Sequence, residues 1–336
     1  MILNLDLPMG GYPIYMERGI IERAGEILSL NRKVLIVTDS GVPVDYAARV
    51  AAQCKEAHVA TVPEGEGSKS LSTLEALLSV MLKNNFARTD CVVAVGGGVV
   101  GDLAGFAAST FMRGIDFYNI PTTVLSQVDS SIGGKVAVNF GGVKNVVGAF
   151  YQPKAVLIDP DVLSTLPKRQ IANGLAEALK MAMTSDVELF EIFERGEALE
   201  KIDAVIERSL RIKKSVVEQD EKESGLRRIL NFGHTLGHGI EAASEGKLYH
   251  GECVALGMTP MCAPDVRARL IAVLQMLELP TQINGELEFI LNFTNHDKKC
   301  EGSAINTVFV DKIGSCRIEK MPLSNWQQYI REQIGG

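Results

Sequence analysis

Apolar runs alternate with segments of helical spacing through the first 160 residues of the chain. Residues 33–38 form a mostly apolar run that ends at Asp39-Ser40-Gly41, which predicts a buried strand followed by a turn. Residues 71–84 carry leucine and methionine side chains at helical spacing, and residues 91–95 predict a second buried strand. The alternation continues with a helix over 102–109 and short strands over 117–120 and 155–158. It predicts a parallel sheet with helices on both faces.

The pattern changes after residue 160, where most apolar positions follow a period of about 3.6 residues. This spacing predicts helices over 168–184, 186–196, 200–220, 232–245, 250–264 and 266–277. Pro260 should bend or end the helix in which it falls, and a β-rich stretch over 307–317 precedes a final helix. We expect an α/β protein with an N-terminal Rossmann-like parallel-sheet domain over 1–160 and a mainly α-helical C-terminal domain over 161–336.

Composition narrows the class of protein. Apolar residues make up 46% and charged residues 22%, as in soluble globular chains. The net charge is −7 and no basic stripe stands out, so we expect no nucleic-acid partner. The longest apolar region, 91–108, is interrupted by glycines and Asp102, so we expect no membrane span, and residues 1–8 do not resemble a secretory signal. The six cysteines form no CxxC pair and indicate reduced thiols in a cytoplasmic protein.

A glycine-rich segment, residues 96–101, directly follows the predicted strand at 91–95 and fits the pattern G-x-G-x-x-G. That pattern is weak evidence by itself, and here it does not follow the first strand, as it does in the usual dinucleotide fold. A plain strand-to-helix turn therefore stays possible. The alternative is a turn whose N–H groups meet a pyrophosphate at a helix N-terminus. Polar clusters at 64–69 and 121–123 favour a bound ligand, because they follow predicted strands.

Three of the five histidines fall between residues 234 and 250. His234 and His238 are four residues apart on a predicted helix and share one face, and His250 begins the next helix. No glutamate lies between the first two, which argues against a zincin. Glu177, in an otherwise apolar helical turn, is a candidate third ligand beside two histidines, which would make a catalytic rather than a structural metal set. Hydrogen-bonded core histidines and a surface glutamate are the alternative.

Cationic residues recur near these elements, and most are expected on solvated faces. Those within the glycine-rich segments 131–135 and 142–145 differ, because loops of this kind let an ammonium group and backbone converge on a phosphate or carboxylate. The cationic residues near the predicted site elements are Arg113, Lys135, Lys144, Lys180, Lys213 and Arg227, of which Lys135 and Lys144 lie in the two glycine-rich segments. They predict a small substrate that carries several negative charges.

Several blocks of the sequence resemble the 3-dehydroquinate synthase family of sugar phosphate cyclases. They are residues 96–102, 121–135, 174–180, 225–227, 231–238 and 250–252. The resemblance implies a carbon–oxygen lyase of the shikimate pathway, which serves aromatic amino acid biosynthesis. It would convert 3-deoxy-D-arabino-heptulosonate 7-phosphate into 3-dehydroquinate and phosphate. The family does so by transient oxidation with NAD, β-elimination of phosphate, re-reduction and an intramolecular aldol closure, with a divalent zinc or cobalt ion.

The resemblance also implies roles for individual residues. Metal ligands would be Glu177, His234 and His250. NAD contacts would be Asp39, Glu66, Lys69, Gly97, Gly98, Asp102, Thr122, Thr123, Lys144, Val162, Leu163, Ser164 and Thr165. Substrate contacts would be Arg113, Asp129, Lys135, Asn145, Lys180, Lys213, Arg227, Asn231, His238 and either Lys298 or Lys299. Catalytic roles would fall to His238, Glu223, Lys135, Asn145 and Lys180, with proton transfer by the first two.

Arg113 matches a residue that reaches the neighbouring subunit's site, which implies a homodimer. Other functions stay open at this point. A cyclase that acts on an amino-sugar or an uncharged heptulose, a metal-dependent polyol or glycerol-phosphate dehydrogenase, and an inactive NAD-binding regulator would share parts of the pattern. The basic set Lys135, Lys180 and Lys213 argues against the dehydrogenase.

Overall fold

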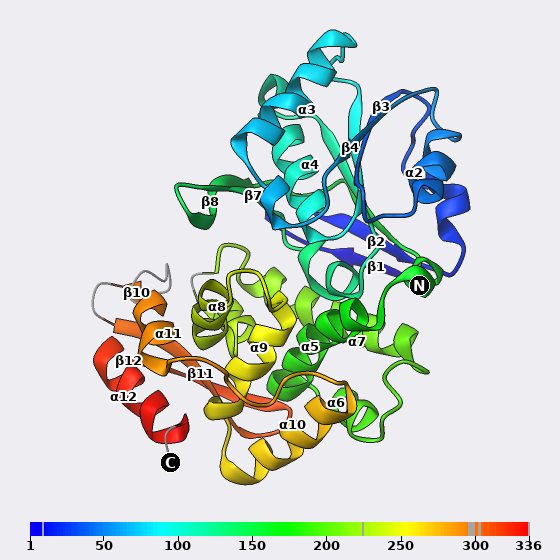
Figure 1. Cartoon of the computed structure of the whole chain (residues 1–336). Coiled ribbons are helices and arrows are strands. Elements are labelled where there is room, and N and C mark those ends of the chain that lie inside the picture. The colour runs from blue at the N-terminus through cyan, green and yellow to red at the C-terminus, as the bar shows by residue number, and fades with distance from the viewer. Residues whose placement is uncertain (9, 224, 295–299, 302–303, 335–336) are drawn as a thin grey trace. The chain divides into compact units, whose positions relative to one another are not determined.

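The computed structural model describes residues 1–8, 10–223, 225–294, 300–301 and 304–334. The chain divides into two compact units, Met1–Pro167 and Lys168–Gly336 (Figure 1). The division follows Pro167, so the segment Val162–Thr165 belongs to the first unit, together with the other residues predicted to contact NAD.

Within the described part of the first unit, seven strands form one sheet in the order β1-β2-β9-β6-β5-β3-β4. All neighbouring strands are parallel except β1 and β2, which pair antiparallel. The strands are β1 (Ile2–Leu5), β2 (Tyr12–Met16), β3 (Lys33–Asp39), β4 (Glu56–Val62), β5 (Cys91–Gly96), β6 (Asp116–Pro121) and β9 (Ala155–Ile158). The predicted parallel sheet is confirmed, and so are the strands predicted at the positions of β3, β5, β6 and β9.

Alternate residues of β3 face different core clusters, because successive side chains of a strand point to opposite faces. Leu35 and Val37 pack with residues of α3 (Leu71–Lys83) and α4 (Gly98–Thr110). Val34 and Ile36 pack with residues of α2 (Val44–Ala51) and η1 (Ile20–Arg23). Figure 1 shows α3 and α4 on one side of β3 and β4, and α2 on the other. The sheet is therefore covered on both faces, as its apolar strands require. The remaining helices are α1 (Ala24–Ile27), η2 (Glu66–Ser68), η3 (Phe111–Arg113), η4 (Ser126–Ser130) and η5 (Pro160–Thr165).

The antiparallel hairpin of β7 (Lys135–Phe140) and β8 (Val143–Phe150) lies outside the main sheet. The segment 142–145 was expected to be a glycine-rich loop, and this prediction is wrong. Phe140 pairs with Val143 across a two-residue turn of Gly141 and Gly142, whose φ angles are 60° and 78°. Two consecutive residues with positive φ fit the tight turn of a hairpin, so the strand resumes directly after the glycines.

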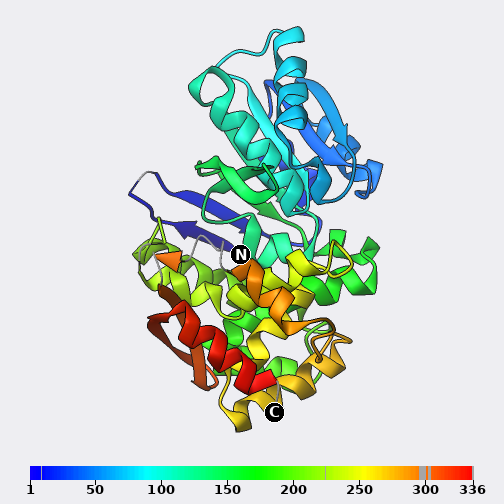
Figure 2. The same ribbon diagram turned by 60° about the vertical axis from the view of Figure 1, so that its left-hand side comes forward.

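The second unit is mainly helical, with a small antiparallel sheet of β10 (Cys300–Glu301), β11 (Ala304–Lys312) and β12 (Ser315–Pro322). Figure 2 shows the final helix, α12 (Leu323–Ile334), in red beside this sheet. The other helices are α5 (Lys168–Ser185), α6 (Val187–Glu194), α7 (Ile202–Gln219), η6 (Leu226–Asn231), α8 (His234–Ala243), α9 (His250–Met258), η7 (Thr259–Met261), α10 (Pro264–Met276) and α11 (Leu287–Thr294). The predicted helix over 250–264 ends early at Met258, because Pro260 lies in the first turn of the short helix η7 and Pro264 starts α10.

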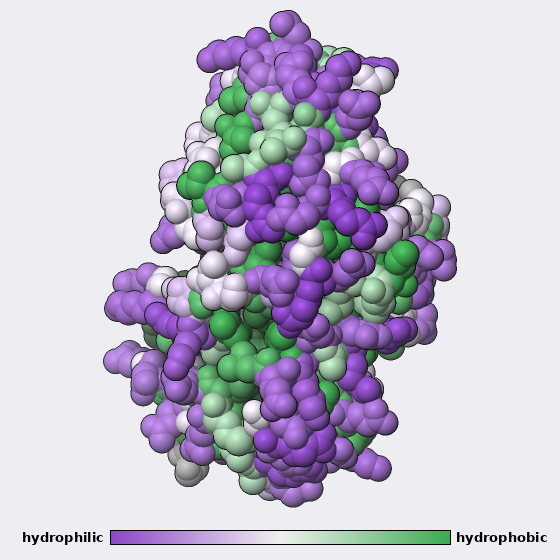
Figure 3. All heavy atoms as spheres, turned by 90° about the vertical axis from the view of Figure 1, so that its right-hand side faces the viewer, coloured by the Kyte–Doolittle hydropathy of each residue, from purple (hydrophilic) through white to green (hydrophobic). Residues whose placement is uncertain are grey.

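Among the residues that the structure describes, no helix has the length and apolarity to cross a membrane. On the face drawn in Figure 3, hydrophilic residues cover the upper end of the view, and apolar residues form smaller patches.

Glycines allow α5, α8 and α9 to approach one another closely. A β-carbon at Gly257 of α9 would lie 2.0 Å from the carbonyl oxygen of Gly233, directly before α8. A β-carbon at Gly251, also in α9, would lie 1.9 Å from the carbonyl oxygen of Asn173 in α5. Neither position has room for a larger side chain, so the backbones of these helices are in direct contact.

The substitution Gly257→Ala is expected to destabilise the protein. The added methyl group would push α9 away from α8, and overpacking of this kind costs about 1–3 kcal/mol. For a unit of this size, that corresponds to a fall in Tm of roughly 3–10 °C in a thermal unfolding experiment. Gly67→Ala is the control, since a β-carbon there meets nothing within 4 Å. Equal Tm values for the two variants would contradict the close packing.

Candidate functional site

Glu177, His234 and His250 converge in the second unit from α5, α8 and α9. Oε1 of Glu177 lies 3.6 Å from Nε2 of His234 and 3.4 Å from Nε2 of His250. One ligand atom from each residue falls within 4.8 Å of the other two. The geometry therefore brings together the metal ligands that the resemblance implied, in the three-ligand arrangement typical of a catalytic metal site.

The environment of Glu177 fits a bound cation. Its side chain is 1% exposed, and neither carboxylate oxygen has a partner with hydrogen-bond geometry in the described part of the chain. The ammonium group of Lys180 does lie 2.6 Å from Oε2 and neutralises part of the charge. A buried carboxylate without hydrogen bonds is costly. A divalent ion held by this carboxylate and the two imidazoles would provide the missing interaction.

Both histidines are oriented through their second ring nitrogen. Nδ1 of His234 lies 3.1 Å from the carbonyl oxygen of Phe232, to which it donates when protonated. Nδ1 of His250 lies 3.2 Å from Oε2 of Glu241. These contacts leave Nε2 of each ring facing Glu177. Hydrogen bonds of this kind fix the tautomer and direction of metal-binding imidazoles.

The charges of this cluster shift the pKa values of its members. Burial would raise the pKa of Glu177, but Lys180 and His250 hold this pKa far below its usual range. Burial would lower the pKa of His250, yet the carboxylates of Glu177 and Glu241 beside its ring raise the pKa to about 10. In the metal-free protein the His250 ring is therefore protonated on both nitrogens at neutral pH, and a metal ion bound through Nε2 would have to displace one proton.

A second group of possible ligands, His238, Glu241 and His250, shares one histidine with the first. The ring of His238 lies 5.5 Å from that of His234 and 5.8 Å from that of His250, measured between centroids. The carboxylate of Glu241 is 15% exposed, whereas that of Glu177 is 1% exposed. The deeper carboxylate, which lacks hydrogen bonds, favours the first group as the metal site.

Polar contacts tie the start of α9 to α5. The guanidinium of Arg169 binds both carboxylate oxygens of Glu252, with distances of 2.6 and 2.8 Å. Glu252 in turn accepts the backbone N–H of Tyr249 at 2.8 Å. The N–H of Gly251 donates to Oδ1 of Asn173 at 2.6 Å. These bonds surround the position of His250 at the start of α9, so they hold it in register with Glu177 in α5.

The second unit also buries cationic side chains predicted to contact the substrate. Lys180, Lys213 and Arg227 are each less than 5% exposed. A guanidinium N–H of Arg227 donates to the backbone oxygen of Glu221. Buried cationic groups of this kind are typical partners of phosphate and carboxylate groups.

Asn231 and Glu223 form a polar pair near these cations, in which the amide of Asn231 donates to Oε1 of Glu223. Glu223 has a φ of 63°, and two further predicted site residues, Arg113 and Asn145, have φ values of 68° and 52°. Non-glycine residues in this left-handed region carry backbone strain, which gathers at functional sites.

In the first unit, Lys69 joins residues from several segments. Its ammonium group lies 2.6 Å from Oδ2 of Asp102 and 3.6 Å from Oε1 of Glu66, and it donates to Oδ1 of Asn145. Burial lowers the pKa of Lys69, but the two carboxylates outweigh burial and raise it. Asn139 connects the same group, because its amide donates to Glu66 and its Oδ1 accepts the N–H of Asn145, both at 2.9 Å. Sequence analysis missed Asn139, since a single asparagine in a strand carries no pattern.

The glycine-rich segment forms the turn between β5 and α4, and Gly97 is the N-cap of α4. A β-carbon at Gly98 would lie 2.9 Å from Oγ of Ser130, and one at Gly97 would lie 3.1 Å from Cγ2 of Thr123. The hydroxyl of Thr123 pairs with Ser126 at 2.8 Å, and Thr122 is buried. The strand–turn–helix context expected of a phosphate-binding turn is therefore present.

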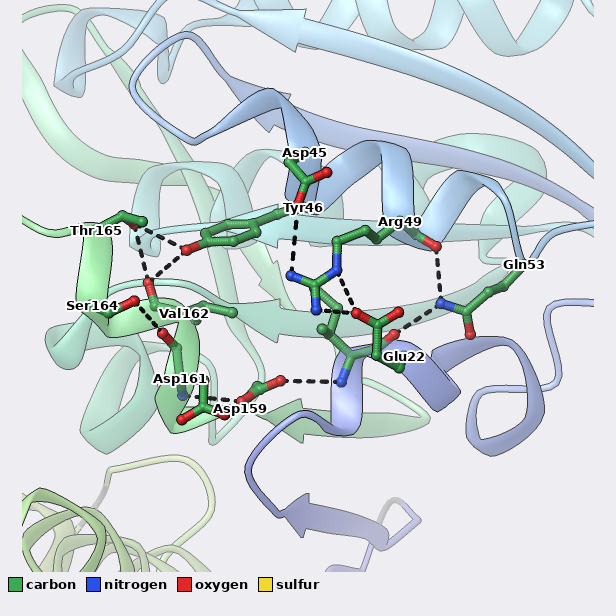
Figure 4. Close-up of polar contacts among 11 residues, drawn as sticks. Glu22, Asp45, Tyr46, Arg49, Gln53, Asp159, Asp161, Val162, Ser164 and Thr165 are labelled. Atoms are coloured by element: carbon green, nitrogen blue, oxygen red, sulfur yellow. Dashed lines mark hydrogen bonds and ion pairs between the residues drawn. The ribbon is translucent and has the colours of Figure 1, made fainter.

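The segment Val162–Thr165 is held by Tyr46 of α2 (Figure 4). The phenol donates to the carbonyl oxygen of Val162 at 3.1 Å and lies 3.1 Å from Oγ1 of Thr165. At the end of β3, Oδ1 of Asp39 accepts the N–H groups of Gly41 and Val42, at 2.8 and 3.2 Å. Sequence analysis did not identify Tyr46, whose contacts are remote in sequence.

The other residues predicted to contact NAD or substrate lie on several different elements. Lys135 begins β7, Lys144 lies in β8, and both are exposed. Asp129 lies in η4 and is partly buried. Lys298 and Lys299 fall outside the described residues.

Two family models match the chain. The model described as "3-dehydroquinate synthase N-terminal" matches residues 59–173, and the model described as "3-dehydroquinate synthase C-terminal" matches residues 174–300. A 3-dehydroquinate synthase from Streptococcus suis (strain 05ZYH33) is 40% identical to the chain over 354 residues. That alignment covers 98% of this chain and 100% of the relative.

Two solved structures have closely similar folds. One is a 2-deoxy-scyllo-inosose synthase complexed with carbaglucose-6-phosphate, NAD+ and Co2+, with a TM-score of 0.89 and 25% identity. That match covers 99% of this chain and 100% of the other. The second is ValA, a 2-epi-5-epi-valiolone synthase from Streptomyces hygroscopicus subsp. jinggangensis 5008 with NAD+ and Zn2+ bound. It has a TM-score of 0.88 and 26% identity, and the match covers 98% of both chains.

Metal affinity is expected to rise with pH. The pKa of His250, raised from 6.5 to about 10 in the metal-free protein, means that protons compete with the ion below that pH. Because one proton is displaced, the apparent association constant should increase by up to about tenfold per pH unit between pH 6.5 and 9. Competition with a chromogenic chelator at a series of pH values measures this slope. An affinity independent of pH would contradict the protonated state of His250.

Proposed function

Because the chain belongs to the 3-dehydroquinate synthase family, we propose that it converts 3-deoxy-D-arabino-heptulosonate 7-phosphate into 3-dehydroquinate and inorganic phosphate. The observation that carries this proposal is the buried Glu177 carboxylate, which faces Nε2 of both His234 and His250. The identity of 40% with a curated synthase over nearly the whole chain supports it. The reaction would place the protein in the shikimate pathway of aromatic amino acid biosynthesis.

The enzyme would use NAD and one divalent ion, zinc or cobalt. The two similar solved structures contain NAD+ with Co2+ or with Zn2+, and the cluster of Glu177, His234 and His250 fits such an ion. When bound, the ion polarises a substrate hydroxyl as a Lewis acid, and NAD accepts a hydride and later returns it.

The first unit would hold the dinucleotide. Gly97 and Gly98 allow the backbone at the N-terminus of α4 to approach the pyrophosphate, where the helix dipole favours negative charge. Lys69 and Asp102 are pre-oriented by their mutual ion pair. The other proposed contacts are Asp39, Glu66, Thr122, Thr123, Lys144 and the segment Val162–Thr165.

Cationic and polar side chains would hold the substrate. Lys135 and Asn145 would bind the phosphate, and the buried Lys213 and Arg227 would bind the carboxylate. Lys180, whose ammonium group contacts Glu177, would orient the hydroxyl that is oxidised. Asp129 and Asn231 complete the proposed contacts.

His238 and Glu223 would transfer protons. A ring nitrogen of His238, on the face of α8 that carries His234, would take a proton from a substrate hydroxyl. The carboxylate of Glu223 accepts a hydrogen bond from the amide of Asn231, which orients it for the same task.

The active form would be a homodimer in the cytoplasm. Arg113 lies beyond the C-terminal end of α4. It is therefore roughly 20 Å from Gly97 and Gly98, which lie at the N-terminal end of that helix. This separation supports a role for Arg113 in the partner's site. The cysteines Cys54, Cys91, Cys253, Cys262 and Cys316 are free thiols, which agrees with a reducing compartment.

The proposed reaction predicts phosphate release without net reduction of NAD. The heptulosonate phosphate, incubated with protein, trace NAD and Zn2+, should release stoichiometric phosphate in a colorimetric assay while absorbance at the NADH wavelength stays flat. With NAD supplied in excess over substrate, NADH formed in proportion to substrate would instead indicate a polyol dehydrogenase. A folded protein that releases no phosphate would refute the proposed synthase activity.

Mixed dimers test the role of Arg113 across the interface. Arg113→Ala and Lys180→Met should each lose most activity alone. If Arg113 acts in the partner's site, half of the randomly mixed dimers contain one intact site, so refolding the two variants together should restore about a quarter of wild-type activity. Mixtures without activity would mean that Arg113 serves its own protomer or that the protein is a monomer.

A further inference from the structure

Glu241 lies on the face of α8 that also carries His234 and His238. The three residues are spaced by four and then three positions, so their side chains project in the same direction. Oε2 of Glu241 lies 3.2 Å from Nδ1 of His250. The carboxylate of Glu241 thus contacts the side of the His250 ring that faces away from Glu177, which lies 3.4 Å from Nε2.

We propose that Glu241 is a positioning residue, which holds the His250 imidazole with Nδ1 protonated and Nε2 directed at the metal. This inference rests on the proposed function, in which His250 is a metal ligand. A neutral imidazole has one donor nitrogen and one acceptor nitrogen, and an ionised carboxylate can only accept. Contact with Glu241 therefore assigns the hydrogen to Nδ1 and leaves the lone pair of Nε2 for the ion.

The two metal-binding histidines differ in how they are held. Nδ1 of His234 faces the backbone oxygen of Phe232, which no side-chain substitution removes. Nδ1 of His250 depends on a side chain that belongs to another helix. Glu241 also binds α8 to the start of α9, so its loss frees the ring of His250 to rotate away from Glu177.

The same geometry argues against Glu241 as a direct ligand. Glu241 and His238 form a possible ligand group with His250, but this group approaches His250 from the Nδ1 side. An ion there could not use the Nε2 atom that faces the buried Glu177. Glu241 therefore supports the metal site from outside the ligand set.

The test measures Co2+ binding to the full-length, metal-free protein. Loss of a carboxylate that orients a metal-binding histidine typically weakens metal affinity about 10- to 100-fold. Glu241→Ala should raise the Kd for Co2+ by that factor. Glu241→Gln should recover much of the affinity, because its amide oxygen accepts the same hydrogen bond. Glu200→Ala, which changes an exposed glutamate of the same unit, is the control and should bind as the wild type does.

The visible absorption spectrum of bound Co2+ separates positioning from ligation. At saturating Co2+, Glu241→Ala should keep the wild-type band positions, since all three ligands remain, whereas Glu177→Ala should shift them. An unchanged Kd in a folded Glu241→Ala variant would overturn the proposal. Altered bands in that variant would overturn it too, in favour of Glu241 as a ligand. A wild-type protein that binds no Co2+ would instead overturn the proposed function, and the positioning role with it.

Discussion

Direct backbone contact among α5, α8 and α9 is the constraint on which the second unit depends. At Gly251 and Gly257, a β-carbon would lie about 2 Å from a backbone oxygen of the neighbouring segment, so these helices sit as close as polypeptide chains allow. Glu177, His234 and His250 project from them with little freedom to adjust. Their mutual distances are therefore a property of helix packing, and a buried carboxylate can be placed against two imidazoles before any ion arrives.

Both units bury positively charged lysine side chains, although the protein as a whole is acidic. Lys69 in the first unit, and Lys180 and Lys213 in the second, are all nearly inaccessible to solvent. Lys69 and Lys180 lie beside carboxylates at 2.6 Å, which compensates for the lost hydration. The overall charge of −7 therefore says little about the ligand, because local groups decide which ions are accepted.

Much of this arrangement could be predicted from short-range patterns. Apolar runs identified β3 and β5, and the spacing of His234 and His238 placed them on one face of the helix that is now α8. The features that the sequence did not reveal depend mostly on contacts between residues that are distant in sequence. Strand β4 is half exposed and lacks an apolar run, so its pairing with β3 leaves no local signal. Asn139 and Tyr46 make such distant contacts as well, whereas Glu241 contacts a residue only nine positions along the chain. Of these, Glu241 alone shares a helix face with recognised residues, and the spacing of that face could have revealed it.

The tight turn at Gly141 and Gly142 makes the hairpin β7–β8 sensitive to length in a way that the main sheet is not. Asn145 lies where the pairing of β7 with β8 is irregular, and its φ of 52° departs from the extended conformation, so the direction of its side chain depends on this local geometry. A residue inserted at the turn would alter this local geometry and weaken the contact of Asn145 with Lys69, while the seven strands described for the first unit kept their pairing. The length of this turn therefore matters more to the polar cluster around Lys69 than to the seven-stranded sheet.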